Sequence, residues 1–299
     1  MPDSAPPDFG VPLSELPPQE KAKRAGSFGA VASHYERFRP GPPRAAVDWI
    51  LPTRVGRLVD LGAGTGALTR LLIDKADELV AVEPDERMRS VLAQEVPGAR
   101  AVDGRGEALP LPDSSVDAVV ASSSWHWMDP VPTLHEMARI LVPGGILAAL
   151  WSGPDPDGPF MVQARQLLAR QSQAGVDGAD TDTESNGAAG EFTSMILGDA
   201  TRPSTSLEIP PAVPFEQPDH EAFTWNVALN AEELIGLLGT LSSIITMPEE
   251  KRQGVIAEAR RLLRELLGIE GEVTVDVAFR ADVWRARRHG EHLGSNIAE

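Results

Sequence analysis

The sequence contains no cysteine. This absence excludes disulfides, thiolate metal ligands, iron–sulfur clusters and cysteine nucleophiles. The six histidines show no H-E-x-x-H motif and no other spacing typical of zinc ligands, so no metal site is predicted. The G-x-S-x-G elbow of many serine hydrolases is also missing. Thiol chemistry, zinc-dependent hydrolysis and this type of serine hydrolysis are therefore not indicated.

Long apolar runs and positive charge are scarce as well. No run reaches the roughly 18 apolar residues of a membrane helix, and the opening MPDSAPPDFG resembles no signal peptide. The chain has 27 Lys and Arg against 44 Asp and Glu, a formal net charge of −17. A polyanion would be repelled by this charge unless a local basic patch held it. We therefore expect a soluble, cytoplasmic protein without nucleic-acid binding or stable membrane insertion.

The apolar content is sufficient for a substantial core. Of 299 residues, 42% are hydrophobic, which suits either one elaborated α/β domain or two smaller ones. Three segments are predicted to lie outside this core. Residues 1–25 carry six prolines and read as a disordered arm, about 171–203 as an acidic insertion, and 289–299 as a flexible tail.

The first half of the chain alternates short apolar runs with segments of helical periodicity. The runs predict strands at 57–62, 78–84, 99–104, 115–123 and 146–151, with helices at 67–76, 85–96 and 132–142. We expect Pro143-Gly144-Gly145 to stop the last of these helices. Apolar strands separated by helices indicate a parallel sheet covered on both faces. Ligands of such sheets bind beyond the carboxyl ends of the strands.

A glycine-rich loop follows the first predicted strand. Residues 60–66 read DLGAGTG, and Ala67 stands where the dinucleotide fingerprint has its last glycine or alanine, so a nicotinamide or flavin remains open. Asp60 would repel a pyrophosphate but attract an α-ammonium group. Glu83, at the end of the second strand, can accept hydrogen bonds from ribose hydroxyls in either case. The loop thus favours a ligand that carries both an amino acid and a nucleoside.

Several motifs resemble one family in order and spacing. DLGAGTGALTRLL, AVEPDERM, GRGEALPLPDSSVDAVV and ARILVPGGILA resemble class I S-adenosylmethionine-dependent methyltransferases of the type 11 domain. The stretches at 28–43, 122–129, 234–252 and 273–287 are similar to the trans-aconitate methyltransferase-like branch. The resemblance implies an α/β fold: a Rossmann-like, seven-stranded, mostly parallel sheet with helices on both faces, an N-terminal cap and a C-terminal antiparallel strand pair. It divides the chain into a cap (26–44), a cofactor-binding core (45–152) and a C-terminal half (153–288) that completes the acceptor pocket.

The resemblance also implies a set of cofactor-binding residues. Motif residues from Asp60 to Gly64 would line the aminocarboxypropyl group, Glu83 would hold the ribose, and Gly106 with Glu107 would meet the adenine edge. The implied residues are Tyr35, Arg39, Asp60, Gly62, Ala63, Gly64, Glu83, Pro84, Met88, Gly106, Glu107 and Ser122.

For three residues on the cofactor side, the sequence leaves two interpretations or an unfilled contact. Met88 is either an adenine neighbour or simple helix core. Arg39 either pairs with a carboxylate or lies solvated on the cap. Arg105 stands where many relatives carry an acceptor for the adenine amine, and arginine has none, so that contact would have to come from backbone.

The acceptor side is predicted around Trp125-His126-Trp127, after the fourth strand. Two tryptophans suit a flat acceptor and a cationic sulfonium, and His126 is either a general base or a positioning group. A helix at 231–245, capped by Asn230 and Glu233, carries Ser242 and Ser243 as further acceptor-side candidates. Bonding of these hydroxyls back to the preceding turn is the alternative. The strands predicted at 220–230 and 273–287 would pair, and 249–268 would form an amphipathic surface helix.

The resulting hypothesis is a methyltransferase that moves a methyl group from S-adenosylmethionine to a small molecule, leaving S-adenosylhomocysteine. A carboxylate or hydroxyl oxygen is the expected acceptor, reached by in-line displacement. C- or O-methylation of a quinone-like ring is the main alternative. A nicotinamide oxidoreductase and a non-catalytic S-adenosylmethionine-binding regulator are the others. The D/N-P-P-aromatic motif of base-methylating relatives is absent, and the acceptor and the oligomeric state stay open.

Overall fold

The computed structural model describes residues 29, 32–166 and 206–290. The predicted arm at 1–25 and the acidic insertion at 171–203 lie outside these residues, as does all but the start of the predicted tail. Within the described helices, the side chains of residues 33, 35, 36, 242, 243, 266 and 267 are also left out.

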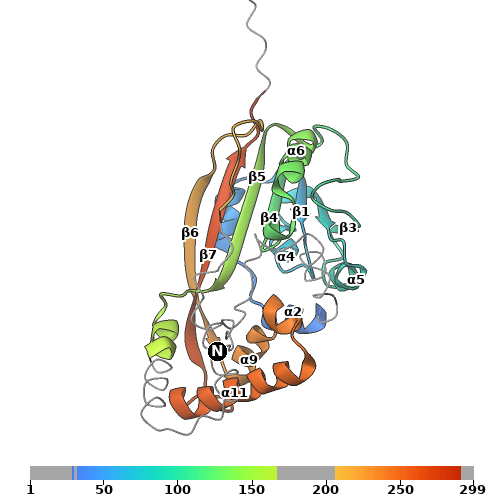
Figure 1. Cartoon of the computed structure of the whole chain (residues 1–299). Helices are drawn as coiled ribbons and strands as arrows, with labels where there is room; N and C mark the ends of the chain where they lie inside the picture. The colour runs from blue at the N-terminus through green and yellow to red at the C-terminus, as the bar shows by residue number, and fades with distance from the viewer. Residues whose placement is uncertain (1–28, 30–31, 167–205, 291–299) are drawn as a thin grey trace, which may run out of the picture.

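A seven-stranded sheet in the order β3-β2-β1-β4-β5-β7-β6 forms the centre of the molecule (Figure 1). The five parallel strands are β1 (Val55–Leu61), β2 (Ala76–Val82), β3 (Arg100–Val102), β4 (Val116–Ser122) and β5 (Leu141–Pro154). β7 (Val275–Arg287) runs antiparallel between β5 and β6 (Asp219–Leu229). This arrangement confirms the predicted Rossmann-like sheet with its antiparallel C-terminal pair.

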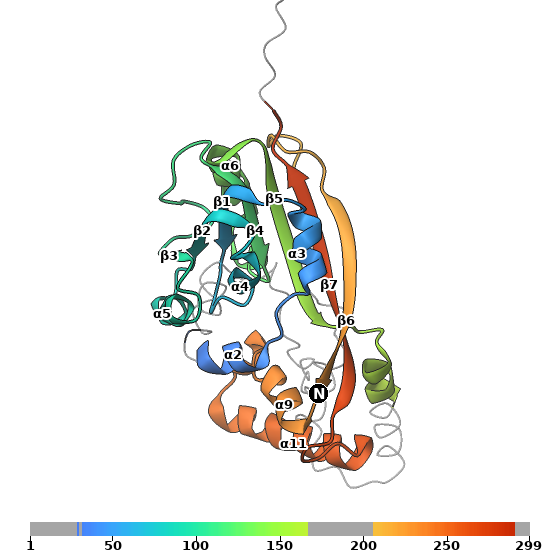
Figure 2. The ribbon, with the colours of Figure 1, turned by 180° about the vertical axis from the view of Figure 1, so that it is seen from behind.

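Helices cover both faces of the sheet because its central strands are apolar on both sides. On one face, α6 (Pro130–Ile140) buries Leu134 and Met137 against β1, β4 and β5. On the other, α3 (Arg44–Ile50) and the short α4 (Thr69–Leu72) pack, and α3 is seen in front of the sheet in Figure 2. The carboxyl ends of β1, β2 and β4 are left open between these layers.

Two of the predicted helices end elsewhere than expected. The helix predicted at 67–76 is limited to α4, since β2 already begins at Ala76. Pro143-Gly144-Gly145 does not stop α6, which ends at Ile140 before β5 begins at Leu141 and runs through all three residues. The expectation for α5 (Glu86–Glu95) holds, because the Asp85 side chain caps it by accepting from the backbone N–H groups of Arg87 and Met88.

A second, helical layer lies beyond one end of the sheet (Figure 1). β6 and β7 continue into it and pack with α9 (Ala231–Leu238), α11 (Glu249–Leu267) and a helix at 159–166. The predicted capping box of Asn230 and Glu233 is present on α9. The predicted helix at 231–245 is interrupted after α9, at Gly239, and resumes as α10 (Ser242–Ile245).

The N-terminal cap joins this helical layer. α2 (Ala32–Phe38) lies beside α9, and Nε2 of His34 is 2.9 Å from the carbonyl oxygen of Gly236. A Cβ added at Gly236 would come within 2.3 Å of the Phe38 ring, so only glycine allows this close approach. Segments from the two ends of the described chain therefore form one unit.

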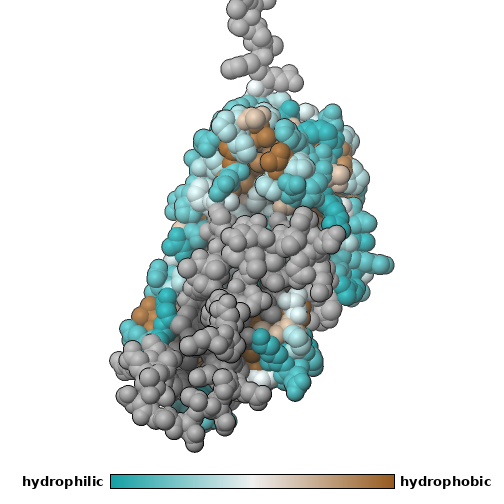
Figure 3. Space-filling model, in the orientation of Figure 1, coloured by the Kyte–Doolittle hydropathy of each residue, from teal (hydrophilic) through white to brown (hydrophobic). Residues whose placement is uncertain are grey.

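Hydrophilic residues cover most of the described surface on the face drawn in Figure 3. Within the described ranges, none of the helices combines the length and apolar character that crossing a membrane requires.

Candidate active site

A cavity of about 640 Å³ opens at the carboxyl ends of β1, β2 and β4. This is the edge at which ligands of parallel sheets bind. Most of the residues predicted for the cofactor lie around it: Arg39, Asp60, Gly62, Ala63, Gly64, Glu83, Pro84, Met88, Gly106, Glu107 and Ser122. Trp127 of the predicted acceptor group lines the same cavity.

The glycine loop lets backbone form one wall of this cavity. Gly64 has a φ of +57°, and a Cβ added there would meet no atom within 4 Å, so this position faces open space. Gly62 has a φ of +70° and lies so close to Ser124 that a Cβ would come within 2.5 Å of its side chain. A ligand can therefore approach the main chain at Gly64 without a side chain between them.

Asp60, the residue before the last of β1, is a buried carboxylate, and one of its oxygens has no partner among the described residues. Its Oδ2 accepts a hydrogen bond of 2.6 Å from Thr69 Oγ1, whereas Oδ1 has no partner among the described residues. The pKa of Asp60 is raised to about 7, mainly by burial; the Thr69 hydrogen bond opposes this rise and the nearby Glu83 charge adds to it. An unpartnered acceptor beside an open cavity fits the α-ammonium group of S-adenosylmethionine.

Glu83, directly after β2, links the glycine loop to the start of α5 through hydrogen bonds. Its Oε2 accepts from the backbone N–H of Gly64 and its Oε1 from that of Asp85, both at 2.9 Å. Burial raises the pKa of this carboxylate, although the two backbone bonds lower it. Each carboxylate oxygen can accept more than one hydrogen bond, so the group is held in place and can still accept from a ribose.

The wall after β3 is built by close packing against the segment that leads into α6. A Cβ at Gly106 would lie 2.5 Å from Met128 Sδ, and Glu107 Oε1 accepts from the backbone N–H of Asp129 at 2.9 Å. Opposite, Met88 is buried in α5 and also lines the cavity. Arg105 lines it too, although its side chain is exposed.

The three residues predicted for the acceptor side, Trp125 to Trp127, lie on one turn but in different environments. Trp125 is only 6% exposed and belongs to the core beside α6 and β5, while Trp127 reaches the cavity. His126 lies next to Trp127, with ring centroids 4.9 Å apart, and its Nδ1 accepts a 3.0 Å hydrogen bond from Trp151 Nε1. Because an indole N–H can only donate, Nδ1 is unprotonated and the neutral ring carries its proton on Nε2.

The N-terminal segment closes the other side of the cavity. Arg39 Nη2 donates to the carbonyl oxygen of Ser152 on β5 at 3.2 Å, and both residues line the space. The predicted Tyr35, Ser242 and Ser243 lie on α2 and α10, but their side chains fall outside the described part of the structure.

Sequence reasoning missed several polar residues around the cavity. Thr65 is buried and its Oγ1 has no partner among the described residues, and Ser124 Oγ donates to the Leu61 carbonyl oxygen at 2.6 Å. Ser123 has a φ of +51°, unusual for a residue with a side chain. The one signal was a run of three serines at the end of the strand predicted at 115–123, which marks a polar edge but not the role of each serine.

The fold, the glycine loop and the cavity together define a class I S-adenosylmethionine-dependent methyltransferase. Residues 59–149 match the family model of a methyltransferase domain. The chain is 33% identical over 237 residues to an uncharacterized methyltransferase of Mycobacterium tuberculosis, covering 79% of this chain and 85% of that protein. The chain therefore belongs to the methyltransferase family, and its cofactor is S-adenosylmethionine.

Two further similarities are weaker. A malonyl-[acyl-carrier protein] O-methyltransferase of Enterobacter lignolyticus is 28% identical over 188 residues, covering 61% of this chain and 74% of that protein. A solved structure proposed to be a type II methyltransferase of Anaeromyxobacter dehalogenans superimposes with a TM-score of 0.52 at 22% identity, covering 84% and 98% of the two chains. The second similarity concerns the fold alone.

Proposed function

We propose that the cavity at the ends of β1, β2 and β4 holds S-adenosylmethionine through a defined set of residues. Asp60 Oδ1 would accept from its α-ammonium group, Glu83 from its ribose, and Gly64 would allow close approach of the main chain. Met88, Gly106 and Glu107 would surround the adenine. The unpartnered Oδ1 beside an open glycine position supports this assignment most directly.

We further propose that the acceptor is a small molecule with a carboxylate or other anionic oxygen. The observation that carries this proposal is the Trp151–His126 hydrogen bond. It occupies Nδ1, so a neutral His126 would have to give up this bond to take up a proton. An acceptor that is already ionised needs no base, whereas a phenol or carbon acceptor usually requires one.

When bound, S-adenosylmethionine supplies an activated methyl group on a sulfonium, which an anionic oxygen can displace in line. The residues of this chain then have to orient the acceptor and exclude water. Trp127 supplies an aromatic wall, and Arg39 supplies a positive charge at the cavity edge, tied to the end of β5. The name of the malonyl-[acyl-carrier protein] O-methyltransferase relative agrees with an oxygen acceptor.

Labelled methyl transfer to a panel of carboxylic acids and a panel of hydroquinones tests this function. We expect transfer to acids, with a product that alkali hydrolyses as an ester. His126→Ala and His126→Gln should both retain substantial turnover at saturating acceptor. A loss of about 100-fold or more in both variants, the size of a general-base contribution, would contradict transfer without a base. Transfer to hydroquinones alone would favour the ring-methylating alternative.

A further inference from the structure

The loop between β3 and β4 reaches the cavity at one end and α6 at the other. Gly104 to Glu107 line the cavity, and the chain then turns along α6 before β4 begins at Val116. Within this loop the only ladder-type pairing among the described residues is a single bridge between Arg105 and Ala108. Near β4, the backbone N–H groups of Ser114 and Ser115 donate to the carbonyl oxygens of Arg139 and Ile140. The stretch between that end and the cavity is held by side chains.

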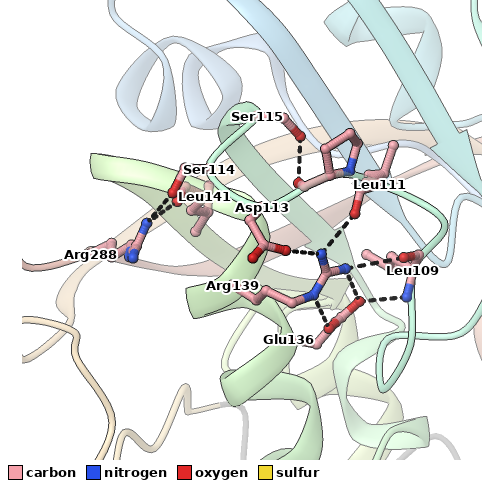
Figure 4. Close-up of polar contacts among 10 residues, drawn as sticks. Leu109, Leu111, Asp113, Ser114, Ser115, Glu136, Arg139, Leu141 and Arg288 are labelled. Carbon is pink, nitrogen blue, oxygen red and sulfur yellow. Dashed lines mark hydrogen bonds and ion pairs between the residues drawn. The ribbon is translucent and has the colours of Figure 1, made fainter.

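Two side chains of α6 bind the main chain of this loop (Figure 4). Glu136 Oε1 accepts from the backbone N–H of Leu109 at 2.6 Å. Arg139 donates to two carbonyl oxygens, from Nη2 to Leu109 at 3.2 Å and from Nη1 to Leu111 at 2.8 Å. The Glu136–Arg139 ion pair thus binds both the backbone N–H and the carbonyl oxygen of Leu109. This residue lies two positions beyond Glu107 at the cavity wall.

Glu136 and Arg139 also fix each other. The guanidinium donates from Nε to Oε2 at 2.8 Å and from Nη2 to Oε1 at 2.6 Å, a two-pronged contact. This partner lowers the pKa of Glu136, which therefore stays ionised near neutral pH. Asp113 adds a bond of 2.6 Å to Arg139, but its side chain is 78% exposed and the contact is correspondingly weak.

The beginning of α6 holds the cavity end of the same loop. Gly106 packs on Met128 and Thr133, and Glu107 accepts from the backbone N–H of Asp129. The loop is therefore attached to one helix at both ends, and the helix is itself buried against the sheet through Leu134 and Met137. Neither Glu136 nor Arg139 lines the cavity.

We infer that Glu136 and Arg139 are positioning residues for cofactor binding. They hold the loop so that Gly106 and Glu107 stand at the cavity wall in the absence of ligand, and the loop need not be ordered when the cofactor binds. This inference rests on the proposed placement of the adenine against Gly106 and Glu107. The pair acts through the loop and touches neither cofactor nor acceptor.

Calorimetric titration with S-adenosylhomocysteine tests this role in Arg139→Met and Glu136→Gln. We expect each substitution to raise the Kd about tenfold, as loss of supporting hydrogen bonds around a site commonly does. Arg139→Lys keeps a charge for Glu136 but cannot reach both carbonyl oxygens, so it should recover part of the affinity. The double variant should bind no more weakly than Arg139→Met alone, because the two residues act as one unit.

Arg57 provides a matched control near the amino end of β1, and it does not line the cavity. Its side chain is 34% exposed, as that of Arg139 is, and it pairs with Glu78. It also donates to the carbonyl oxygen of Ser115, the last residue of the same loop, so it controls for a contact at the loop end that does not line the cavity. Arg57→Met should therefore cost comparable stability while leaving the Kd within about twofold, the range of a remote surface change. Hydrogen exchange of the unliganded protein should be faster at Leu109 and its neighbours in Arg139→Met but not in Arg57→Met.

The outcomes separate the inference from the function on which it rests. A Kd for Arg139→Met within about twofold of wild type, or an equal rise in Arg57→Met, would overturn the positioning role. If Arg139→Met does not fold, Glu136→Gln and Arg139→Lys decide the same question. An unchanged Kd in Glu83→Gln would overturn the proposed cofactor site, and the inference with it. A raised Kd in Glu83→Gln beside an unchanged Kd in the Arg139 variants would overturn the inference alone.

Discussion

Asp60 shows how one buried carboxylate at the cavity links folding and ligand binding to pH. Its raised pKa means that the protein without ligand binds a proton there more tightly than the unfolded chain does. The associated stability is present below about pH 4, the ordinary pKa of aspartate, and is lost as the pH rises through about 7. A cationic ligand beside Oδ1 reverses this preference, since it favours the ionised carboxylate.

Ligand binding should consequently release a proton below pH 7. Calorimetric titration with S-adenosylhomocysteine at pH 6, in buffers of different ionisation enthalpy, measures that release. We expect up to one proton for the wild type, and Kd values that fall as the pH rises toward about 7. Asp60→Asn should bind more weakly, with neither effect. Equal proton release in the Asn variant would show that another group is responsible.

A comparison of Gly64 with Gly144 separates the cost of backbone strain from the loss of ligand access. Gly64 and Gly144 have φ values of +57° and +79°, and a Cβ at either would meet nothing within 4 Å. Alanine at each should therefore cost similar stability, about 1–2 kcal/mol, from the left-handed backbone alone. Only Gly64→Ala should also weaken S-adenosylhomocysteine binding, because only Gly64 lines the cavity.

Thermal unfolding and calorimetry on these two variants check that expectation. A matched fall in Tm with a raised Kd for Gly64→Ala alone supports close approach of the ligand to the main chain. Unaltered binding in Gly64→Ala would place the cofactor elsewhere in the cavity.

At the scale of elements, two helix glycines differ in their surroundings, and only Gly236 lies in the contact between α2 and α9. Gly236 on α9 has the Phe38 ring against it, whereas Gly254 on α11 has open space around it. Gly254→Ala should stabilise the protein by about 0.5–1 kcal/mol through helix propensity. Gly236→Ala should destabilise it, since a Cβ 2.3 Å from a rigid ring forces α2 away from α9.

The two alanine variants can be compared by denaturant unfolding. Because Phe38 precedes Arg39 at the cavity edge, we also expect Gly236→Ala to weaken S-adenosylhomocysteine binding while Gly254→Ala does not. A stable Gly236→Ala protein would indicate that α2 moves without cost.

The elements most easily predicted from sequence carry their own local signals. Asp85 before α5, and Asn230 with Glu233 at α9, satisfy helix N–H groups within a few residues. The extent of α4 depends instead on where the neighbouring strand begins, which periodicity does not report. The burial of Trp125 and the exposure of Trp127 to the cavity follow from a single 3₁₀ turn.

At the scale of the whole molecule, the alternation of strands and helices predicts the parallel sheet. It also predicts that the site lies at the carboxyl ends of the strands, where the glycine loop follows β1. Contacts between segments that are distant in the sequence cannot be predicted from such a pattern. Glu136 and Leu109 lie 27 residues apart, and Trp151 and His126 lie 25 apart. No local pattern brings these side chains together, so the hydrogen-bonded state of His126 and the hold on the β3–β4 loop required the folded chain.

The length of β7 has a consequence for how the two layers can behave. Ala286 and Val283 of this strand belong to the two faces of the sheet, and Val277 and Phe279 belong to the helical layer. One uninterrupted strand is thus shared by three apolar clusters. The helical layer is consequently not a separable domain. A chimaera that exchanges this layer would have to cut β7, and the remaining part of its hydrogen-bonded ladder would lose its partner strand.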